Sequence, residues 1–410
     1  MSLTVSFNSK EQHIYQIGFN GFSQLDQCEW HEPSISAPAL VASFPEHDII
    51  GIYVGFEAAI AWSRLKILLF GWSQLFPTHL YYNYGNSTHM TGTILKDELS
   101  INGELKKCQV TSTTATRPVL ILIQTTTLDL LQIETVGDIQ QHRSNRLDQS
   151  NEKYKTHWIM SDCIEFAHTA EYGSAQLVSG LIVYWHLDDP AMVHTLAVSG
   201  FDRLPKLIDL CAGAVHCVAL TEEGEVWTWR MGFATALHGQ LGYIDSTVLA
   251  DGFQAQIVEA LQGMRMASIS AGRQHTMVVS KDGTIYSFGS NRYSQLGIAS
   301  SHGKPEPIDL DLESNSNIKS EIACGFHHSI ATDGTRLYGA GWNSYNQLGR
   351  MKELGCIHEM RQLDIPLPAQ CSIVGVYAGG WSTFILATVP CLQSNYQSET
   401  ITHKSIAVKE

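Results

Sequence analysis

The sequence has few basic residues and no basic run. Its 26 Lys and Arg stand against 40 Asp and Glu, which gives a formal net charge of −14. A surface that binds nucleic-acid phosphates would show as a basic stripe. We therefore expect no direct sequence-specific binding to nucleic acid. The same charge suits a basic partner, such as a histone-like segment rich in Lys and Arg.

Targeting, membrane-spanning and disulfide patterns are also missing. The opening stretch, MSLTVSFNSKEQ, has no basic segment followed by an apolar one, so no secretory signal is predicted. The most apolar long stretch, residues 58–72, is interrupted by Arg64 and Lys66, and we expect no membrane span. Nine cysteines are scattered without CxxC or Cys/His ligand spacing, which indicates reduced core residues.

Catalytic motifs are absent as well. The patterns GxSxG, GxGxxG and GxxxxGK[ST] do not occur. His186-Leu187-Asp188 has the spacing of two ligands of a non-haem iron site, but its place after an expected strand favours a turn. The adjacent His327 and His328 would point to opposite faces of a strand and could not clamp a metal. We expect no enzyme activity, no catalytic residue, no metal and no cofactor.

What the sequence does contain is a repeat, clearest at residues 269–297, ISAGRQHTMVVSKDGTIYSFGSNRYSQLG. Two runs of β-branched and aromatic residues flank Asp282-Gly283, which predicts a β-hairpin with a type I′ turn. Gly272 stands at a strand end, where the backbone conformation or a close approach would exclude a Cβ. His275, three residues later, is expected to be buried and bonded to backbone within its own repeat.

The repeat recurs along the chain with a period near 54 residues, as the spacing of Gly272, Gly325 and Gly379 shows. Copies at 208–242 and 322–349 are clear, the copy at 49–75 is degenerate, and those at 108–136 and 165–187 are weak. The positions that define the repeat are Gly213, His216, Gly224, Gly272, His275, Gly283, Gly325, His328, Gly334 and Gly379.

The two ends of the chain hold complementary halves of one further copy. Residues 376–388 match only the first half of the repeat, and residues 14–25 match only the second half. The halves make one whole repeat only if the array closes on itself, which also removes exposed sheet edges. The prediction is an all-β, seven-bladed β-propeller over residues 1–390 as one domain, with a closing blade shared between the termini and a polar tail at 391–410.

These residues resemble the regulator-of-chromosome-condensation repeat family. The resemblance rests on G-x-x-H, the acidic-Gly turn and G-x-N-x-x-x-Q-L-G, and it is strongest over residues 208–349. It implies a seven-bladed propeller with this kind of split blade. Within the family, the short start before IYQIGFNGFSQL and the degenerate early copies are similar to the domain-containing member that partners a JmjC-type dioxygenase.

The resemblance implies a non-enzymatic scaffold that regulates a JmjC-type dioxygenase at chromatin, with nuclear or chromosome-associated location and a further cytosolic pool. The alternative is a guanine-nucleotide exchange factor for a small GTPase, as in the founding member of the family. Exchange requires a wedge-like loop, and the copy at 165–187 is too degenerate to locate one.

Loops outside the repeat are the candidates for partner contacts, because propellers bind through loops. Tyr81, Tyr82 and Tyr84 lie in a Tyr-rich connection, residues 76–107, and suit interface anchors. Packing of these rings over the first two copies is the alternative. Residues 137–155 are polar and are expected to form an exposed insertion.

Overall fold

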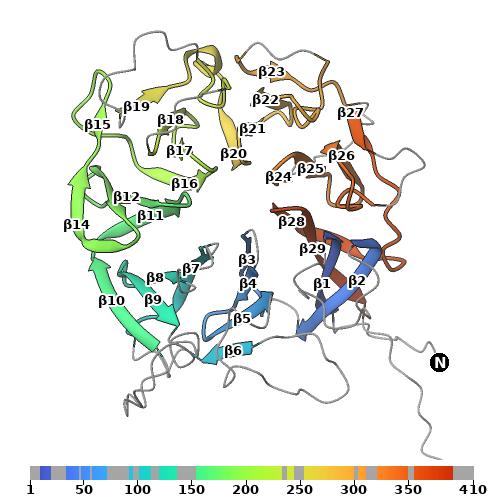
Figure 1. Cartoon of the computed structure of the whole chain (residues 1–410), viewed down its shortest axis with the longest axis horizontal. Coiled ribbons are helices and arrows are strands. Elements are labelled where there is room, and N and C mark those ends of the chain that lie inside the picture. The colour runs from blue at the N-terminus through green and yellow to red at the C-terminus, as the bar shows by residue number, and fades with distance from the viewer. Residues whose placement is uncertain are drawn as a thin grey trace, which may run out of the picture.

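Short runs of β-branched and aromatic residues, separated by glycine-containing turns, form the strands of the computed structural model. The structure describes residues 10–19, 34–45, 48–55, 58–71, 92–95, 101–111, 120–135, 154–232, 238–243, 254–299, 303–310, 321–349 and 355–390. Their strands form seven sheets, each of four strands except one of five, and neighbouring strands are antiparallel except for one parallel pair at the outer edge of the five-stranded sheet. The sheets stand side by side in a closed ring around a central channel (Figure 1). The predicted all-β, seven-bladed propeller is confirmed.

The blades are numbered in chain order, and each is given from its innermost strand outward. The first has β3 (Gly51–Val54), β4 (Ala58–Trp62), β5 (Lys66–Gly71) and β6 (Gly92–Leu95). The second has β7 (Leu105–Val110), β8 (Leu120–Thr125), β9 (Leu130–Thr135) and β10 (Tyr154–Met160). The third has β11 (Cys163–His168), β12 (Tyr172–Leu177), β13 (Ile182–His186) and β14 (Asp189–Thr195).

The fourth blade has β16 (Leu207–Ala212), β17 (His216–Thr221), β18 (Val226–Arg230), β19 (Gln254–Ile257) and β15 (Ala197–Val198) at its outer edge. A short 3-10 helix, η5 (Glu259–Leu261), follows it. The fifth has β20 (Met266–Ala271), β21 (His275–Ser280), β22 (Ile285–Gly289) and β23 (Glu306–Pro307). The sixth has β24 (Glu321–Cys324), β25 (His328–Thr332), β26 (Leu337–Trp342) and β27 (Cys356–Gln362).

The seventh blade is built from both ends of the described chain, as predicted from the split repeat. Its strands are β28 (Ser372–Gly379), β29 (Ser382–Pro390), β1 (Lys10–Phe19) and β2 (Ser34–Pro45). β1 and β29 pair antiparallel without a register shift, from Lys10 opposite Pro390 to Gly18 opposite Ser382. Main-chain hydrogen bonds therefore join the two ends of the sequence and close the ring.

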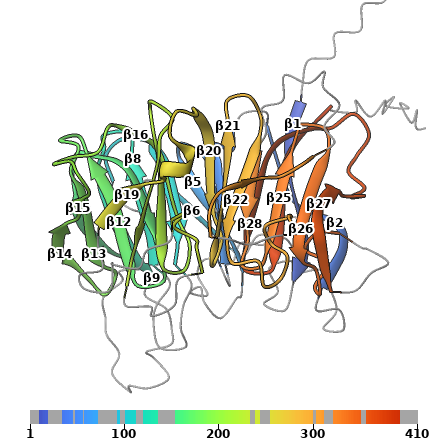
Figure 2. The ribbon, with the colours of Figure 1, turned by 90° about the horizontal axis from the view of Figure 1, so that it is seen from above.

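Apolar side chains fill the spaces between neighbouring blades. The buried residues form seven clusters, and each lies at one of the seven blade interfaces. Side chains alternate along a strand, so a middle strand serves two interfaces. In β17, for example, Cys217 and Ala219 face the third blade, whereas Val218 and Leu220 face the fifth. Strands buried on both faces have nearly continuous apolar runs, and Figure 2 shows them standing across the thickness of a disc.

The predicted type I′ turn at Asp282-Gly283 is wrong. Type I′ needs positive φ at both central residues, but only Gly283 has it, at 92°. The Gly283 N–H donates to the Ser280 carbonyl at 2.9 Å, so Lys281 and Asp282 are the central residues of the turn and Gly283 follows in the left-handed region. Gly180 and Gly224 repeat this arrangement. Gly283 is therefore the fourth residue of the turn, where the sequence predicted it as the third.

The outermost strands account for the other differences from the sequence-based interpretation. The connection expected at 76–107 includes β6 and the start of β7, and the insertion expected at 137–155 ends within β10. Outer strands pair on one side only and have weak apolar patterns, as in β14, whose side chains are mostly exposed. The remainder of the insertion and the tail at 391–410 lie outside the described residues. No helix in the described ranges is long and apolar enough to cross a membrane.

The interface between the closing blade and the first blade gives a direct test of ring closure. Phe384 on β29 is 1% exposed and packs in the cluster that joins these blades. We expect Phe384→Ala to lower the free energy of unfolding by about 3–5 kcal/mol, because it leaves a cavity there. Urea unfolding measures the change. Leu65→Ala, at a side chain 61% exposed, is the control and should change stability by less than about 0.5 kcal/mol. A similarly small change for Phe384→Ala would contradict the packing described.

Candidate functional site

The histidines of the repeat connect neighbouring blades. Nε2 of His216 lies 3.1 Å from Oγ1 of Thr276 in the fifth blade, and Nε2 of His275 lies 2.9 Å from Oγ of Ser329 in the sixth. His328 makes the same contact with Thr383 of the closing blade, at 3.1 Å. All three side chains are fully buried. The expected backbone bond within the same repeat is wrong as the main contact, because each ring reaches a hydroxyl on the next blade.

These hydroxyls also determine which nitrogen carries the proton. Ser329 Oγ donates to the Gln295 carbonyl at 2.6 Å, and Thr276 Oγ1 donates to the Gln240 carbonyl at 2.9 Å. A hydroxyl has one proton to donate, so His275 must donate from Nε2 to Ser329. The imidazole is thereby held as the neutral Nε2–H tautomer. We call this chain of histidine, hydroxyl and glutamine carbonyl the interblade relay.

The glycine of G-x-x-H makes room for the ring. A Cβ on Gly272 would lie 2.1 Å from Cε1 of His275 and 2.5 Å from the Gly325 carbonyl oxygen. Gly325 has the same relation to His328, at 2.1 Å. Glycine is required at both positions because of these close approaches and not because of backbone conformation, since neither residue has a positive φ. The spacing of three residues therefore places the ring directly over a position that must lack a side chain.

The second motif, G-x-N-x-x-x-Q-L-G, folds its own loop. Asn291 Oδ1 accepts from the Leu296 N–H at 3.1 Å, and Gln295 Oε1 accepts from the Tyr293 N–H at 2.9 Å. Asn343 and Gln347 repeat these bonds in the sixth blade, where Gln347 holds the Tyr345 N–H at 3.1 Å. The glutamine of the motif thus holds the backbone N–H of a tyrosine in both blades, although the motif does not specify a tyrosine at that position.

Aromatic side chains gather where these loops meet the G-x-x-H turns of the fifth, sixth and closing blades. The Tyr293 and His327 ring centroids are 4.3 Å apart, and Trp342 lies 5.3 Å from Tyr345 and 5.9 Å from Trp381. All these side chains are partly exposed. With Phe326 and the exposed Arg273 and Arg292, they form what we call the aromatic–arginine patch. The patch comprises Arg273, Arg292, Tyr293, Phe326, His327, Trp342, Tyr345 and Trp381.

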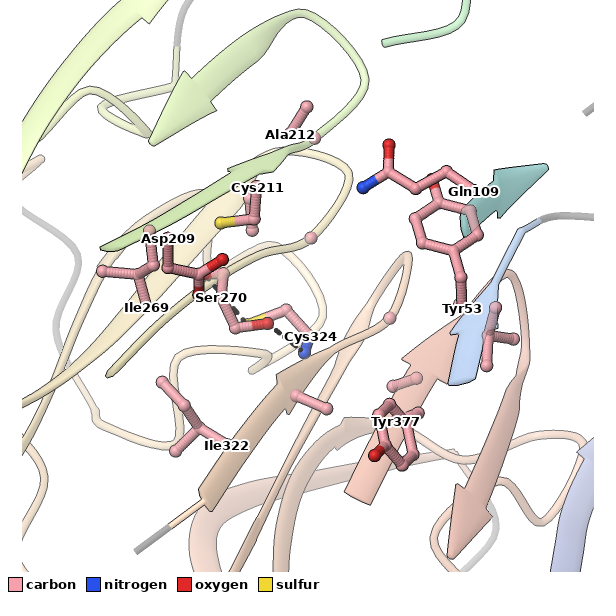
Figure 3. Close-up of a pocket in the computed structure, with 18 of the residues that line it drawn as sticks. Tyr53, Gln109, Asp209, Cys211, Ala212, Ile269, Ser270, Ile322, Cys324 and Tyr377 are labelled. Atoms are coloured by element: carbon pink, nitrogen blue, oxygen red, sulfur yellow. Dashed lines mark hydrogen bonds between the residues drawn. The ribbon is translucent and has the colours of Figure 1, made fainter. Parts of the chain in front are cut away.

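The central channel is the other candidate site. Its cavity of about 760 Å³ is bordered by the innermost strands of all seven blades. Figure 3 shows Tyr53, Gln109, Asp209 and Tyr377 around this space, contributed by different blades. Gln109 is 5% exposed, and its Oε1 has no hydrogen-bond partner among the described residues. The lining mixes amide, hydroxyl, thiol and aliphatic groups, which favours water or a small polar molecule.

A partly buried ion cluster lies in the channel wall. Lys107 Nζ is 3.0 Å from Glu165 Oε2, 3.0 Å from the Leu210 carbonyl oxygen and 3.7 Å from Asp209 Oδ1. Burial alone lowers the pKa of Lys107, but Glu165 and Asp209 outweigh it and raise that pKa above its ordinary value. The lysine is therefore a fixed cation that joins the second, third and fourth blades. It is not a proton donor near neutral pH.

Neither place assembles a catalytic group from the described residues. Burial raises the pKa of the Cys211 thiol in the channel well above its usual range, so the nucleophilic thiolate is disfavoured. Over the described ranges, no cluster of three His, Cys, Asp or Glu residues could hold a metal ion. His186 accepts from the Asp188 N–H at 3.2 Å in a turn and packs edge-on against Tyr172. His327 lies in the patch, whereas His328 is in a blade interface.

The sequence proposes three tyrosines for partner contacts. Tyr81, Tyr82 and Tyr84 lie outside the described residues, so their role stays a prediction. The aromatic–arginine patch was missed, apart from the separate interpretation of His327. A signal was present: aromatic residues occupy the variable positions of both motifs, at Phe326 and Trp381 in the turns and at Tyr293 and Tyr345 in the loops.

The closed ring of seven blades, with its split last sheet, defines the protein as a seven-bladed β-propeller. Models of the regulator of chromosome condensation (RCC1) repeat match residues 266–295 and 282–332. The chain therefore contains RCC1 repeats, and the resemblance found in its motifs is confirmed at the level of the repeat.

Relatives and solved structures agree with this assignment. The ultraviolet-B receptor UVR8 of Arabidopsis thaliana is 30% identical over 237 residues, which cover 55% of this chain and 50% of that protein. Human RCC1 domain-containing protein 1 is 28% identical over 214 residues, covering 43% and 54%. The chain thus spans about half the length of these relatives. The crystal structure of Prp20p from Saccharomyces cerevisiae has a TM-score of 0.67 at 16% identity, covering 94% of this chain and 93% of that one. This likeness concerns the fold.

The buried relay histidines make stability sensitive to acid. Burial lowers the pKa of His216, His275 and His328 to about 3, from 6.5 for a solvated imidazole. Below pH 6.5 the unfolded chain takes up protons that the folded chain excludes. The free energy of unfolding should therefore fall as pH decreases from about 6.5 towards 3, by up to about 1.4 kcal/mol per pH unit for each histidine.

Urea unfolding between pH 6.5 and 4.5 tests this prediction. His275→Gln should be less stable than the wild type at pH 7. Its free energy of unfolding should also fall less steeply with decreasing pH, by about 1.4 kcal/mol per pH unit, since one titrating group is removed. The exposed His238 provides the matched control, His238→Gln, whose slope should equal that of the wild type. An unchanged slope for His275→Gln would show that His275 is not held neutral in the folded state.

Proposed function

We propose that the protein is a non-enzymatic protein-binding scaffold, and that the aromatic–arginine patch is its main contact surface. The observation that supports this most is the gathering of partly exposed Trp, Tyr, Phe and Arg side chains from three blades. Trp, Tyr and Arg are the residues that supply most of the binding energy in protein interfaces. Seven joined blade interfaces hold the loops rigidly, which reduces the entropy lost on binding.

The proposed partner is a JmjC-type dioxygenase acting at chromatin, with a nuclear or chromosome-associated location. This part of the proposal rests on the motif resemblance described above and on the similarity to human RCC1 domain-containing protein 1. Basic histone-like segments are further candidates, since the net charge of −14 attracts them. Prp20p itself has binding properties towards Gsp1p and histones.

Guanine-nucleotide exchange on a small GTPase is the second candidate, because the motifs resemble a family whose founding member has that activity and because Prp20p, which shares the fold, has binding properties towards Gsp1p. Exchange would need a loop that displaces the nucleotide from the GTPase. The two candidates differ in what releases the partner: added nucleotide would release a GTPase but not a dioxygenase.

An affinity pull-down from nuclear and cytosolic extracts, read by mass spectrometry, tests the proposal. We expect a JmjC-type dioxygenase at about one copy per scaffold, because a single patch provides a single site. Trp381→Ala should reduce its recovery at least about fivefold, since an interface tryptophan typically contributes more than about 1 kcal/mol.

Trp158→Ala is the matched control, because Trp158 is 62% exposed on β10 outside the patch. Its recovery should equal that of the wild type, and urea unfolding confirms that both variants are folded. A small GTPase released by added nucleotide would instead support exchange. Equal recovery with both variants would remove the patch from the proposal.

A further inference from the structure

We infer that the aromatic–arginine patch binds an acidic segment of a partner protein that packs an aliphatic or aromatic side chain against the exposed parts of the rings. The inference rests on the proposed scaffold function and specifies the chemistry of its partner. It depends on the two arginines, the local field around His327 and the mutual orientation of the rings.

Both arginines lie against rings and have no carboxylate partner among the described residues. The Arg273 guanidinium is 5.5 Å from the centroid of Phe326, and that of Arg292 is 5.7 Å from the centroid of Tyr293. Neither takes part in an ion pair with a described residue, although both side chains are exposed. Stacking orders the planar group but leaves its N–H donors free. Each can therefore donate two parallel hydrogen bonds to a carboxylate from outside.

The electrostatic surroundings of His327 show that the patch is locally positive. Its pKa is lowered to about 4, first by burial and then by the positive charges of Arg273 and Arg292, with no carboxylate acting in the opposite direction. The chain as a whole has a net charge of −14. Screening at physiological salt acts over about 8 Å, so a bound segment experiences mainly the nearby arginines. Within a strongly acidic protein, this spot favours negative charge.

The arrangement of the rings favours contact with a single side chain over stacked bases. Trp342 meets Tyr345 at 76° and Trp381 at 82°, whereas Tyr345 and Trp381 are tilted by 35°, so the rings share no common stacking direction. Sites that stack successive nucleotides combine open ring faces with a long basic groove. Two arginines and rings set at mixed angles do not form such a groove. They fit a short peptide with acidic residues on both sides of a Leu, Phe or Trp.

Fluorescence anisotropy with the full chain tests the inference. The probe is a labelled peptide in which Glu residues flank a central Trp-Leu pair. The comparison ligands are the same peptide with Lys in place of Glu, and labelled single-stranded oligothymidine. We expect the acidic peptide to bind at physiological salt and the other two to bind at least roughly tenfold more weakly, the effect of losing about one charge-assisted bond.

The variant Arg273→Gln/Arg292→Gln should weaken binding of the acidic peptide by roughly tenfold or more. Its control, Arg203→Gln/Arg265→Gln, removes the same charge at the other end of the blades. There, Arg203 bonds the Ser179 carbonyl in the β12–β13 turn, and Arg265 immediately precedes β20. This control should bind within about twofold of the wild type. Trp381→Ala should weaken binding as well. Because this change removes no charge, a weaker affinity would show that the rings contact the peptide.

Three outcomes would overturn the inference. They are equal binding of the acidic and basic peptides, preferential binding of oligothymidine, and a dimer of this chain that the Arg273→Gln/Arg292→Gln change dissociates in sedimentation, which would make a second copy the occupant. The scaffold proposal is judged separately by the pull-down. If the acidic peptide does not bind while Trp381→Ala still reduces capture of the dioxygenase, the proposed function stands and only the acidic chemistry of the partner segment is wrong.

Discussion

The pairing of β1 with β29 is the constraint on which the other contacts depend. Those main-chain bonds join residues more than three hundred positions apart and complete the seventh sheet. Closing so long a loop costs entropy that local contacts cannot offset one at a time. It is offset by the cluster that closure creates between the closing blade and the first blade, and by the further cluster between the sixth and closing blades. Each interface then restricts its two neighbours, so the ring is rigid as a whole.

Within that ring, some buried polar groups find a partner on another blade. The interblade relay pairs the imidazole Nε2 of His275 with a hydroxyl, and that hydroxyl with a carbonyl, at buried sites. Apolar packing is tolerant of small shifts, whereas the relay requires matched distances. The two kinds of contact have different roles: apolar clusters stabilise the interface, and the relay fixes how far one blade can slide against the next.

The fold could be predicted because its determinants are periodic. Gly272 and His275 return with their spacing intact in the sixth blade, and the split repeat required closure. The outer strands could not be predicted, since strands such as β14 have few buried side chains and follow loops of variable length. The partner of His275 was also beyond the sequence, because Ser329 belongs to another repeat. The patch depends on three blades meeting, so no single copy of the repeat could indicate it.

The RCC1 match at residues 282–332 starts in the β21–β22 turn of the fifth blade and ends with β25 of the sixth. This match is thus offset by half a sheet from the fifth blade, whereas the match at residues 266–295 begins with β20 itself. A chimera that exchanges residues 282–332 would have both of its joints within sheets. The strands on either side of each joint are held together by main-chain hydrogen bonds, which depend little on the side chains. The exchange would alter two blades. Substitutions within residues 282–332 are therefore expected to affect two adjacent blades and the interface between them.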